Sequence, residues 1–227
     1  MLDTKKFLFC LLLISLVGFI LRFYQYDKIP PFLETADEVM YPWAGMSLLK
    51  TGTPSSWSWF PSYKNAQRVE YWGAEFNIVT PWTEKPPLYS LVTGFVSLLF
   101  GEDQFSAVKI STIRLTPLFI SFITILLVGL SASVIFNNKI AILASLIYAT
   151  TPAIVVSNRL SLTENLLTPL IFLAILILKI KKGIIWEKVA PYLLGIISGM
   201  AILTRQFGII LPIYIAIILL IEKKKTQ

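Results

Sequence analysis

Two short charged motifs in the first half of the chain carry residues that could do chemistry. Asp37 and Glu38 follow the first long apolar run, and Glu84-Lys85-Pro86-Pro87 comes later, just before another apolar run. A placed carboxylate can take a proton from an attacking hydroxyl group, and a cation can hold a phosphate. Because both motifs lie beside apolar runs, they indicate a reaction at a membrane surface on a substrate that lipid presents.

The acidic pair also has a structural explanation. Thr35-Ala36-Asp37-Glu38 has the S/T-x-x-E form of a capping box, in which Glu38 would only cap a helix. Pro42 complicates that helix, whose start would then lie nearer Tyr41. Capping explains one acid but not two adjacent ones. We therefore interpret Asp37, together with Glu38, as a catalytic group.

Glu84 and Lys85 precede a run that begins with two prolines. An acid and a proline are common in the first turn of a helix, which would account for Glu84. A cation is unfavourable at that end of a helix, where it could instead meet a phosphate. We expect Lys85 to contact phosphate and keep Glu84 as an additional acidic site residue.

Charged residues at the ends of later apolar runs form a second group of candidates. Arg114 opens one run, Arg159 and Glu164 flank a polar turn, and Arg205 separates two runs. Snorkelling explains each arginine, and a salt bridge explains Arg159 with Glu164. However, a guanidinium group suits phosphate well, and an uncompensated charge at membrane depth is costly. We expect these arginines to bind phosphate and Glu164 to be a further acidic site residue.

The composition points to a membrane protein. The chain is 56% hydrophobic and 15% charged, with a mean hydropathy of +0.72. The net charge of +7 lies mostly in lysine clusters beside apolar runs, which argues against nucleic acid as a partner. The single cysteine, Cys10, can form no intrachain disulfide. There is no histidine, which removes Ser-His-Asp catalysis and histidine-bound metal.

The apolar runs predict helices at residues 7–23, 87–100, 112–136, 139–156, 165–180, 189–204 and 207–221. The first run lacks a small-x-small cleavage site, so we interpret it as an uncleaved anchor rather than a signal peptide. The run at 87–100 would give a helix of only about 21 Å, against a hydrocarbon core of about 30 Å. We therefore interpret it as an external juxtamembrane helix.

Six spans then remain, with both ends in the cytoplasm. Ten of the 20 basic residues and three of the 13 acids fall inside, so the whole net charge of +7 is cytoplasmic. The expected fold is an all-α polytopic bundle of about six transmembrane helices, with juxtamembrane helices in an external loop at 24–111. The turn at 157–164 and residues 204–206 share that external side, so nearly all the unusual polar residues converge there.

The external loop is also rich in aromatic side chains. They fit an aromatic belt at the membrane surface or rings on which a sugar stacks, and the sequence leaves both open. These residues are Trp57, Trp59, Phe60, Tyr63, Tyr71, Trp72 and Trp82.

In order and spacing, these motifs resemble the GT-C membrane glycosyltransferases, which include protein O-mannosyltransferases and the lipid A aminoarabinose transferase. The resemblance covers nearly the whole chain. It rests on Asp37-Glu38, Glu84 to Tyr89 leading to Leu98 to Gly101, Ile113 to Leu115, Asn158 to Glu164, and Gly199 to Arg205.

The resemblance implies an inverting glycosyltransferase of the cell envelope. It would move a sugar from a polyprenyl-phosphate donor in the membrane to a lipid, glycan or protein acceptor on the external face. Asp37 would activate the acceptor, while Lys85, Arg159 and Arg205 would face the donor phosphate. No cofactor is certain, and a divalent Mg²⁺ or Mn²⁺ held by carboxylates stays open.

Members of this group usually run to at least twice this length, so residues 1–227 correspond to the shared N-terminal catalytic half without the C-terminal half. Two other functions compete with catalysis. A non-catalytic binder of lipid-linked sugar, or an accessory to a flippase, would differ only in not needing Asp37 for turnover. A small transporter is disfavoured, because the charged residues lie at the ends of the spans and not near their centres.

Overall fold

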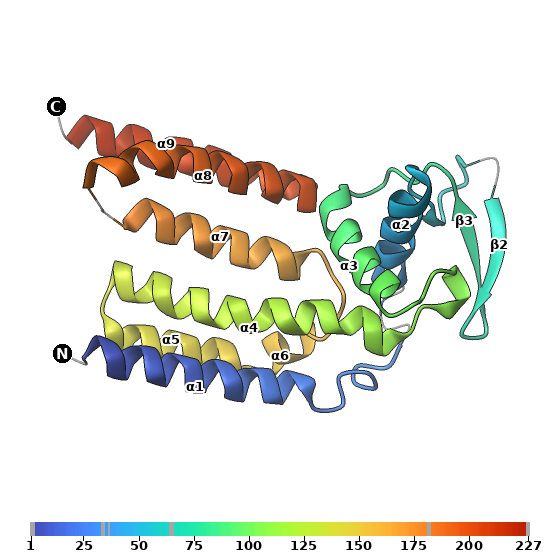
Figure 1. Cartoon of the computed structure of the whole chain (residues 1–227), viewed down its shortest axis with the longest axis horizontal. Helices are drawn as coiled ribbons and strands as arrows, with labels where there is room; N and C mark the ends of the chain where they lie inside the picture. Colours follow the sequence, from blue (N-terminus) through green and yellow to red (C-terminus); the bar gives the residue numbers. More distant parts are fainter. Residues whose placement is uncertain (1–2, 33–34, 36, 64–65, 181–182, 226–227) are drawn as a thin grey trace.

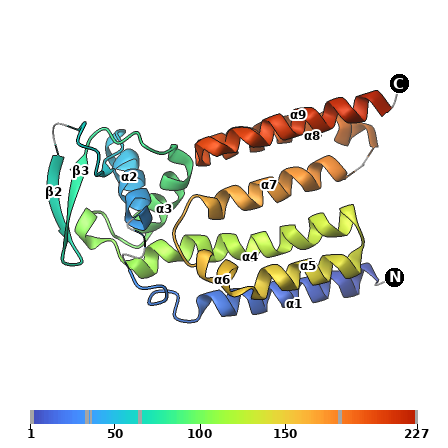
Figure 2. The ribbon, with the colours of Figure 1, turned by 180° about the vertical axis from the view of Figure 1, so that it is seen from behind.

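The computed structural model describes residues 3–32, 35, 37–63, 66–180 and 183–225, and they are mostly helical. Helices α1, α4, α5, α7, α8 and α9 run roughly along the long axis and form a bundle (Figure 1). Both termini lie at one end of it, and α2, α3 and a small sheet form a cap at the other end (Figures 1 and 2). The bundle helices are α1 (Thr4–Phe23), α4 (Ile110–Ile135), α5 (Asn138–Thr150), α7 (Glu164–Lys179), α8 (Gly183–Thr204) and α9 (Ile210–Lys225).

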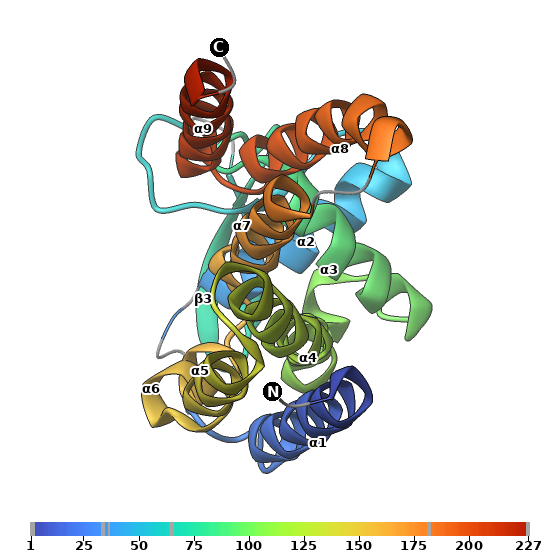
Figure 3. The ribbon, with the colours of Figure 1, turned by 90° about the vertical axis from the view of Figure 1, so that its left-hand side faces the viewer.

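The bundle is a stack with α4 near its centre. α4 contacts α1 and α5 on one side and α7 on the other, and α8 and α9 continue beyond α7 (Figure 3). By length and composition, α1 and α4 could each cross a membrane, and shorter apolar helices include Asn138–Thr150 and Lys188–Thr204. Two of the six expected spans therefore have full crossing length among the described residues.

One expected span is broken. The helix predicted at 139–156 divides into α5 and the short α6 (Pro152–Ser157). Thr151 adopts an extended backbone with ψ 118°, because the residue before a proline avoids the helical region. Pro152 is the first residue of α6. An N–H at this position would have no partner within the helix, so its absence in proline costs no helical hydrogen bond.

The cap contains a sheet that the all-α prediction missed. β1 (Ser56–Trp57) and β2 (Ala66–Tyr71) both pair antiparallel with β3 (Ala74–Val79). Trp72 and Gly73 join β2 to β3 with positive φ at both positions, as a two-residue hairpin turn requires. Five of the six residues of β2 are exposed or half-buried, so the strand lacks the apolar alternation that would reveal it in the sequence.

An aromatic cluster holds the sheet onto α2 (Asp37–Thr51). Trp43 is fully buried and makes edge-to-face contacts with Tyr71 and Phe76, each at a centroid distance of 5.3 Å. Its Nε1 donates a hydrogen bond to the Phe105 carbonyl oxygen at 2.9 Å. Several of the loop aromatics therefore form a core, and only part of the aromatic set stays available to a ligand or a membrane surface.

Two glycines set the distance between α2 and α3 (Pro87–Leu99). A Cβ at Gly45 would overlap the Ser90 carbonyl oxygen, and a Cβ at Gly94 would overlap the backbone of Gly45. The two helices therefore cross in backbone contact. Because α2 begins at Asp37 and α3 follows Glu84-Lys85 directly, this crossing brings the two charged motifs together.

Candidate functional site

The adjacent acids of α2 face different surroundings. Asp37 is half-buried and lines a cavity of about 220 Å³ at the start of α2. Glu84 and Lys85, which come just before α3, line the same cavity, so the structure brings the two charged motifs together. The full lining is Asp37, Met40, Trp57, Ser58, Trp59, Phe60, Glu84 and Lys85.

Aromatic rings form one wall of this cavity. Trp57 is buried and supports Trp59 edge-to-face, with ring centroids 5.6 Å apart. Trp59 is 72% exposed, and Phe60 beside it is also exposed. Glu84 Oε1 is buried and has no hydrogen-bond partner among the described residues. The cavity thus combines a carboxylate with one unpartnered oxygen, an ammonium group and exposed ring faces, which suit a hydroxylated and anionic ligand.

The two other external segments join this site. Arg205, at the end of α8, forms an ion pair with Glu164 at the start of α7. Gln206 Nε2 donates a hydrogen bond to the Glu84 carbonyl oxygen at 3.1 Å. Ser161 N–H donates a hydrogen bond to Glu38 Oε1 of α2 at 3.0 Å. Segments 24–111, 157–164 and 204–206 therefore meet, as the sequence predicted.

Tyr41 is a site residue that the sequence argument did not single out. It is 2% exposed and packs edge-to-face on Tyr89, with centroids 5.2 Å apart. Burial and the nearby charge of Asp37 raise the pKa of Tyr41 to about 12, against smaller lowering effects of Thr163 and Arg205. Its phenol therefore stays protonated at neutral pH. The i, i+4 spacing from Asp37 on one helix could have indicated it.

The turn that carries Arg205 depends on a close approach. After α8, a 3₁₀ turn (Gln206–Ile209) reverses the chain, and Gly208 N–H donates to the Arg205 carbonyl oxygen at 2.8 Å. A Cβ at Gly208 would overlap the backbone of Ala201 in the preceding helix. The reversal therefore presents Arg205 beside α7 and the cap.

Glu38 turns away from the cavity into a buried network. Its two carboxylate oxygens accept hydrogen bonds from Arg114 Nε at 2.9 Å and Nη2 at 2.8 Å, and the Ser161 N–H donates to it at 3.0 Å. Arg114 Nη1 donates to the carbonyl oxygens of Tyr26 and Pro30. Both side chains are 0% exposed, so neither faces a space that a ligand could enter. We therefore assign them a positioning role instead of the catalytic and phosphate-binding roles expected from the sequence.

The guanidinium donors of Arg159 are also used in hydrogen bonds within the protein. Its guanidinium group donates to the carbonyl oxygens of Leu21, Arg22 and Ile29, at and just beyond the end of α1. Arg22, which sequence reasoning missed, is fully buried and donates to Asn158 and to the Ala149 and Tyr148 carbonyl oxygens. These two arginines join the end of α1 to α5 and α6, and carbonyl oxygens of the chain occupy the Arg159 guanidinium group that was expected to face the donor phosphate.

A metal site has limited support. Among the described residues, no group of three or more Asp, Glu, Cys or His side chains lies close enough to hold an ion. Asp37 and Glu84 share the cavity, but an oxygen-liganded Mg²⁺ or Mn²⁺ site takes more ligands than these two carboxylates.

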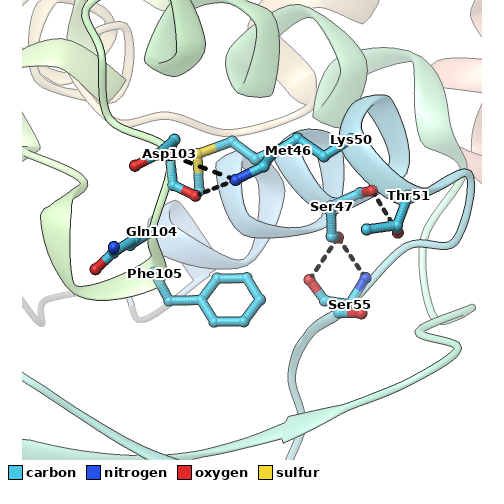
Figure 4. Close-up of a pocket in the computed structure, with 8 residues that line it drawn as sticks. All are labelled: Met46, Ser47, Lys50, Thr51, Ser55, Asp103, Gln104 and Phe105. Atoms are coloured by element: carbon cyan, nitrogen blue, oxygen red, sulfur yellow. Dashed lines mark hydrogen bonds and ion pairs between the residues drawn. The ribbon is translucent and has the colours of Figure 1, made fainter.

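A second cavity, of about 330 Å³, lies at the other end of α2 (Figure 4). Lys50 Nζ contacts the Asp103 carboxylate at 3.5 Å and donates to the Asp103 carbonyl oxygen at 2.9 Å. Ser47 Oγ accepts from the Ser55 N–H at 2.6 Å. These groups satisfy one another, and none of the residues expected to do chemistry lines this cavity.

Comparison with known proteins identifies the family. The family model described as dolichyl-phosphate-mannose-protein mannosyltransferase matches residues 84–227, more than half of the chain. This range includes Lys85, Glu164 and Arg205 and begins after Asp37. No curated protein and no solved structure matches the chain. The family implies glycosyl transfer from a lipid-linked donor. The chain therefore belongs to the dolichyl-phosphate-mannose-protein mannosyltransferase family, a GT-C type of glycosyltransferase.

Proposed function

We propose that this protein transfers a sugar from a polyprenyl-phosphate donor to an acceptor hydroxyl on the external face of the membrane, with Asp37 as the general base. The observation that carries the proposal is that Asp37 and Lys85 line one cavity. A base for the acceptor and a cation for the donor phosphate are the two groups that this reaction needs.

The chemistry follows from the arrangement of the cavity. The acceptor oxygen attacks the anomeric carbon, the bond from that carbon to the phosphate oxygen breaks, and Asp37 takes the acceptor proton. The phosphate leaves as an anion that Lys85 stabilises, with Arg205 as a second cation beside the site, so the leaving group needs no acid. Attack from the side opposite the phosphate inverts the anomeric centre.

The remaining lining residues fit a sugar ring. Trp59 and Phe60 offer exposed faces on which the apolar face of a sugar can stack. Glu84 Oε1 lacks a donor, and a sugar hydroxyl would supply one. In this role Glu84 binds substrate rather than moving a proton.

The surface of the bundle supports a multi-pass arrangement in the cell membrane with the cap outside. Along α1, large apolar side chains such as Phe9 and Ile20 are more than 60% exposed, and α4, α5, α8 and α9 carry similar exposed residues. Water would not favour such a surface, whereas lipid would. Lys5 and Lys6 in the first turn of α1 and Lys179 in the last turn of α7 lie at the ends opposite the cap, which fits the positive-inside rule.

The test is transfer from a radiolabelled polyprenyl-phosphate sugar by the protein in nanodiscs. Asp37→Asn should lower the transfer rate by about 10²- to 10⁴-fold and leave donor binding unchanged, because the amide accepts no proton at neutral pH. Glu75→Gln, an exposed acid on β3, is the matched control and should keep the wild-type rate. An Asn variant with more than about a tenth of the wild-type rate would show that Asp37 is not the base. Donor binding without transfer by the wild type would favour a non-catalytic binder.

A further inference from the structure

We propose that Glu164 is a built-in substitute for the donor phosphate. It holds Arg205 while the site is empty and gives way when a lipid phosphate arrives. The inference rests on the proposed function for the identity of the anion, but it concerns binding and not the transfer step.

The contacts of Glu164 support this role. Its carboxylate forms the ion pair with Arg205, and Thr163 Oγ1 donates to its Oε2 at 3.0 Å. The Arg205 guanidinium also lies 5.6 Å from the centroid of the Phe207 ring. A cation with an aromatic face on one side and an anion on the other is a formed anion site, and Glu164 now fills it.

The exposure of the pair makes exchange feasible. The side chains of Arg205 and Glu164 are 30% and 52% exposed, whereas both members of the Glu38–Arg114 pair are fully buried. Exposed ion pairs contribute little to stability, and a released Glu164 carboxylate can return to water. A phosphate offers more acceptor oxygens in a geometry that a guanidinium group matches, so it can displace the carboxylate.

The experiment measures binding of a short-chain prenyl phosphate without sugar to the full-length protein in nanodiscs. Replacement of Glu164 by Gln removes the competing charge, so affinity should rise by about 1.4- to 5-fold. Arg205→Ala should lower affinity at least about tenfold. Affinity of the double variant should equal that of Arg205→Ala, since Glu164 acts only through Arg205.

Controls separate this result from other causes. Glu75→Gln removes one exposed negative charge elsewhere and should leave affinity unchanged. Thr163→Val removes a hydrogen bond that holds Glu164 and should raise affinity by a smaller factor than Glu164→Gln. Inorganic phosphate in a parallel titration should show the same order of variants, if the shared phosphate group is what displaces Glu164.

Unchanged or weaker prenyl phosphate binding in Glu164→Gln, with wild-type thermal stability, would overturn the inference. A gain that persists in the double variant would also overturn it, because the effect would then not pass through Arg205. The transfer reaction can fail independently: a protein that binds phosphate in the predicted order without sugar transfer would contradict the proposed function and leave the role of Glu164 intact.

Discussion

Two groups of cations lie where the bundle meets the cap, and they differ in what surrounds them. Arg22, Arg114 and Arg159 are buried, and protein oxygens occupy their guanidinium groups. Lys85 and Arg205 are partly exposed and lie at a cavity or in an exchangeable ion pair. All of these cations lie at the ends of apolar runs in the sequence. In the structure, one group holds helices together and the other lies where a ligand can reach it.

The comparison shows that hydrogen-bond occupancy separates these roles better than charge alone does. A guanidinium group has five donors in a fixed plane. In Arg114, Nε and Nη2 meet the two Glu38 oxygens, and Nη1 donates twice to carbonyl oxygens of the segment that follows α1. No donor edge is left for a phosphate, whereas Arg205 exchanges one exposed carboxylate for another anion.

The largest expected effect is on stability, and it tests the buried ion pair of Glu38 and Arg114. Glu38→Ala should destabilise the protein by about 3–5 kcal/mol, because it leaves Arg114 buried and unpaired. The measurement is thermal or denaturant unfolding in detergent. Glu38→Leu combined with Arg114→Met should recover most of the loss, since it removes both charges from the core. Near-wild-type stability of Glu38→Ala would place Arg114 with the ligand-accessible cations.

The next effect tests how the site is held together. Gly94→Ala should cost about 1–3 kcal/mol of stability, because its methyl group would meet the backbone of Gly45. It should also lower transfer activity, since Asp37 and Lys85 are placed by this crossing. Gly195→Ala is the matched control, because a Cβ there meets no atom within 4 Å. Equal stability of both variants would show that the α2–α3 contact does not set the site.

The smallest effect concerns the accessible cations. Lys85→Ala should weaken binding of the polyprenyl-phosphate donor about tenfold, as expected for one charge-assisted contact, and leave the unfolding transition unchanged. The control is Arg68→Ala, which removes a cation from an exposed pair with Glu75 at 3.6 Å. If Lys85→Ala instead lowered stability as Glu38→Ala does, Lys85 would belong with the structural cations.

Much of this arrangement could be predicted from the sequence. Apolar runs located α1, α4 and α3, and the 14-residue run at 87–100 became a helix at Pro87–Leu99. The polar turns after those runs did meet at one end. The sequence could not show that Glu38 and Arg114 form a buried structural pair. They lie 76 residues apart, and only their tertiary contact reveals the pairing. The sheet was not predicted for a different reason: its strand β2 is largely exposed and shows no apolar alternation in the sequence.

The contacts of Glu38 also have a consequence for how the protein is made. Glu38 leaves the ribosome early, but its partners Arg114 and Ser161 follow 76 and 123 residues later. At roughly 5–20 residues per second, the carboxylate waits about 6–25 s for its last hydrogen bond. During biosynthesis the contacts of Glu38 can therefore be completed only after α4 and the turn before α7 have emerged, so the proposed site beside it is completed late.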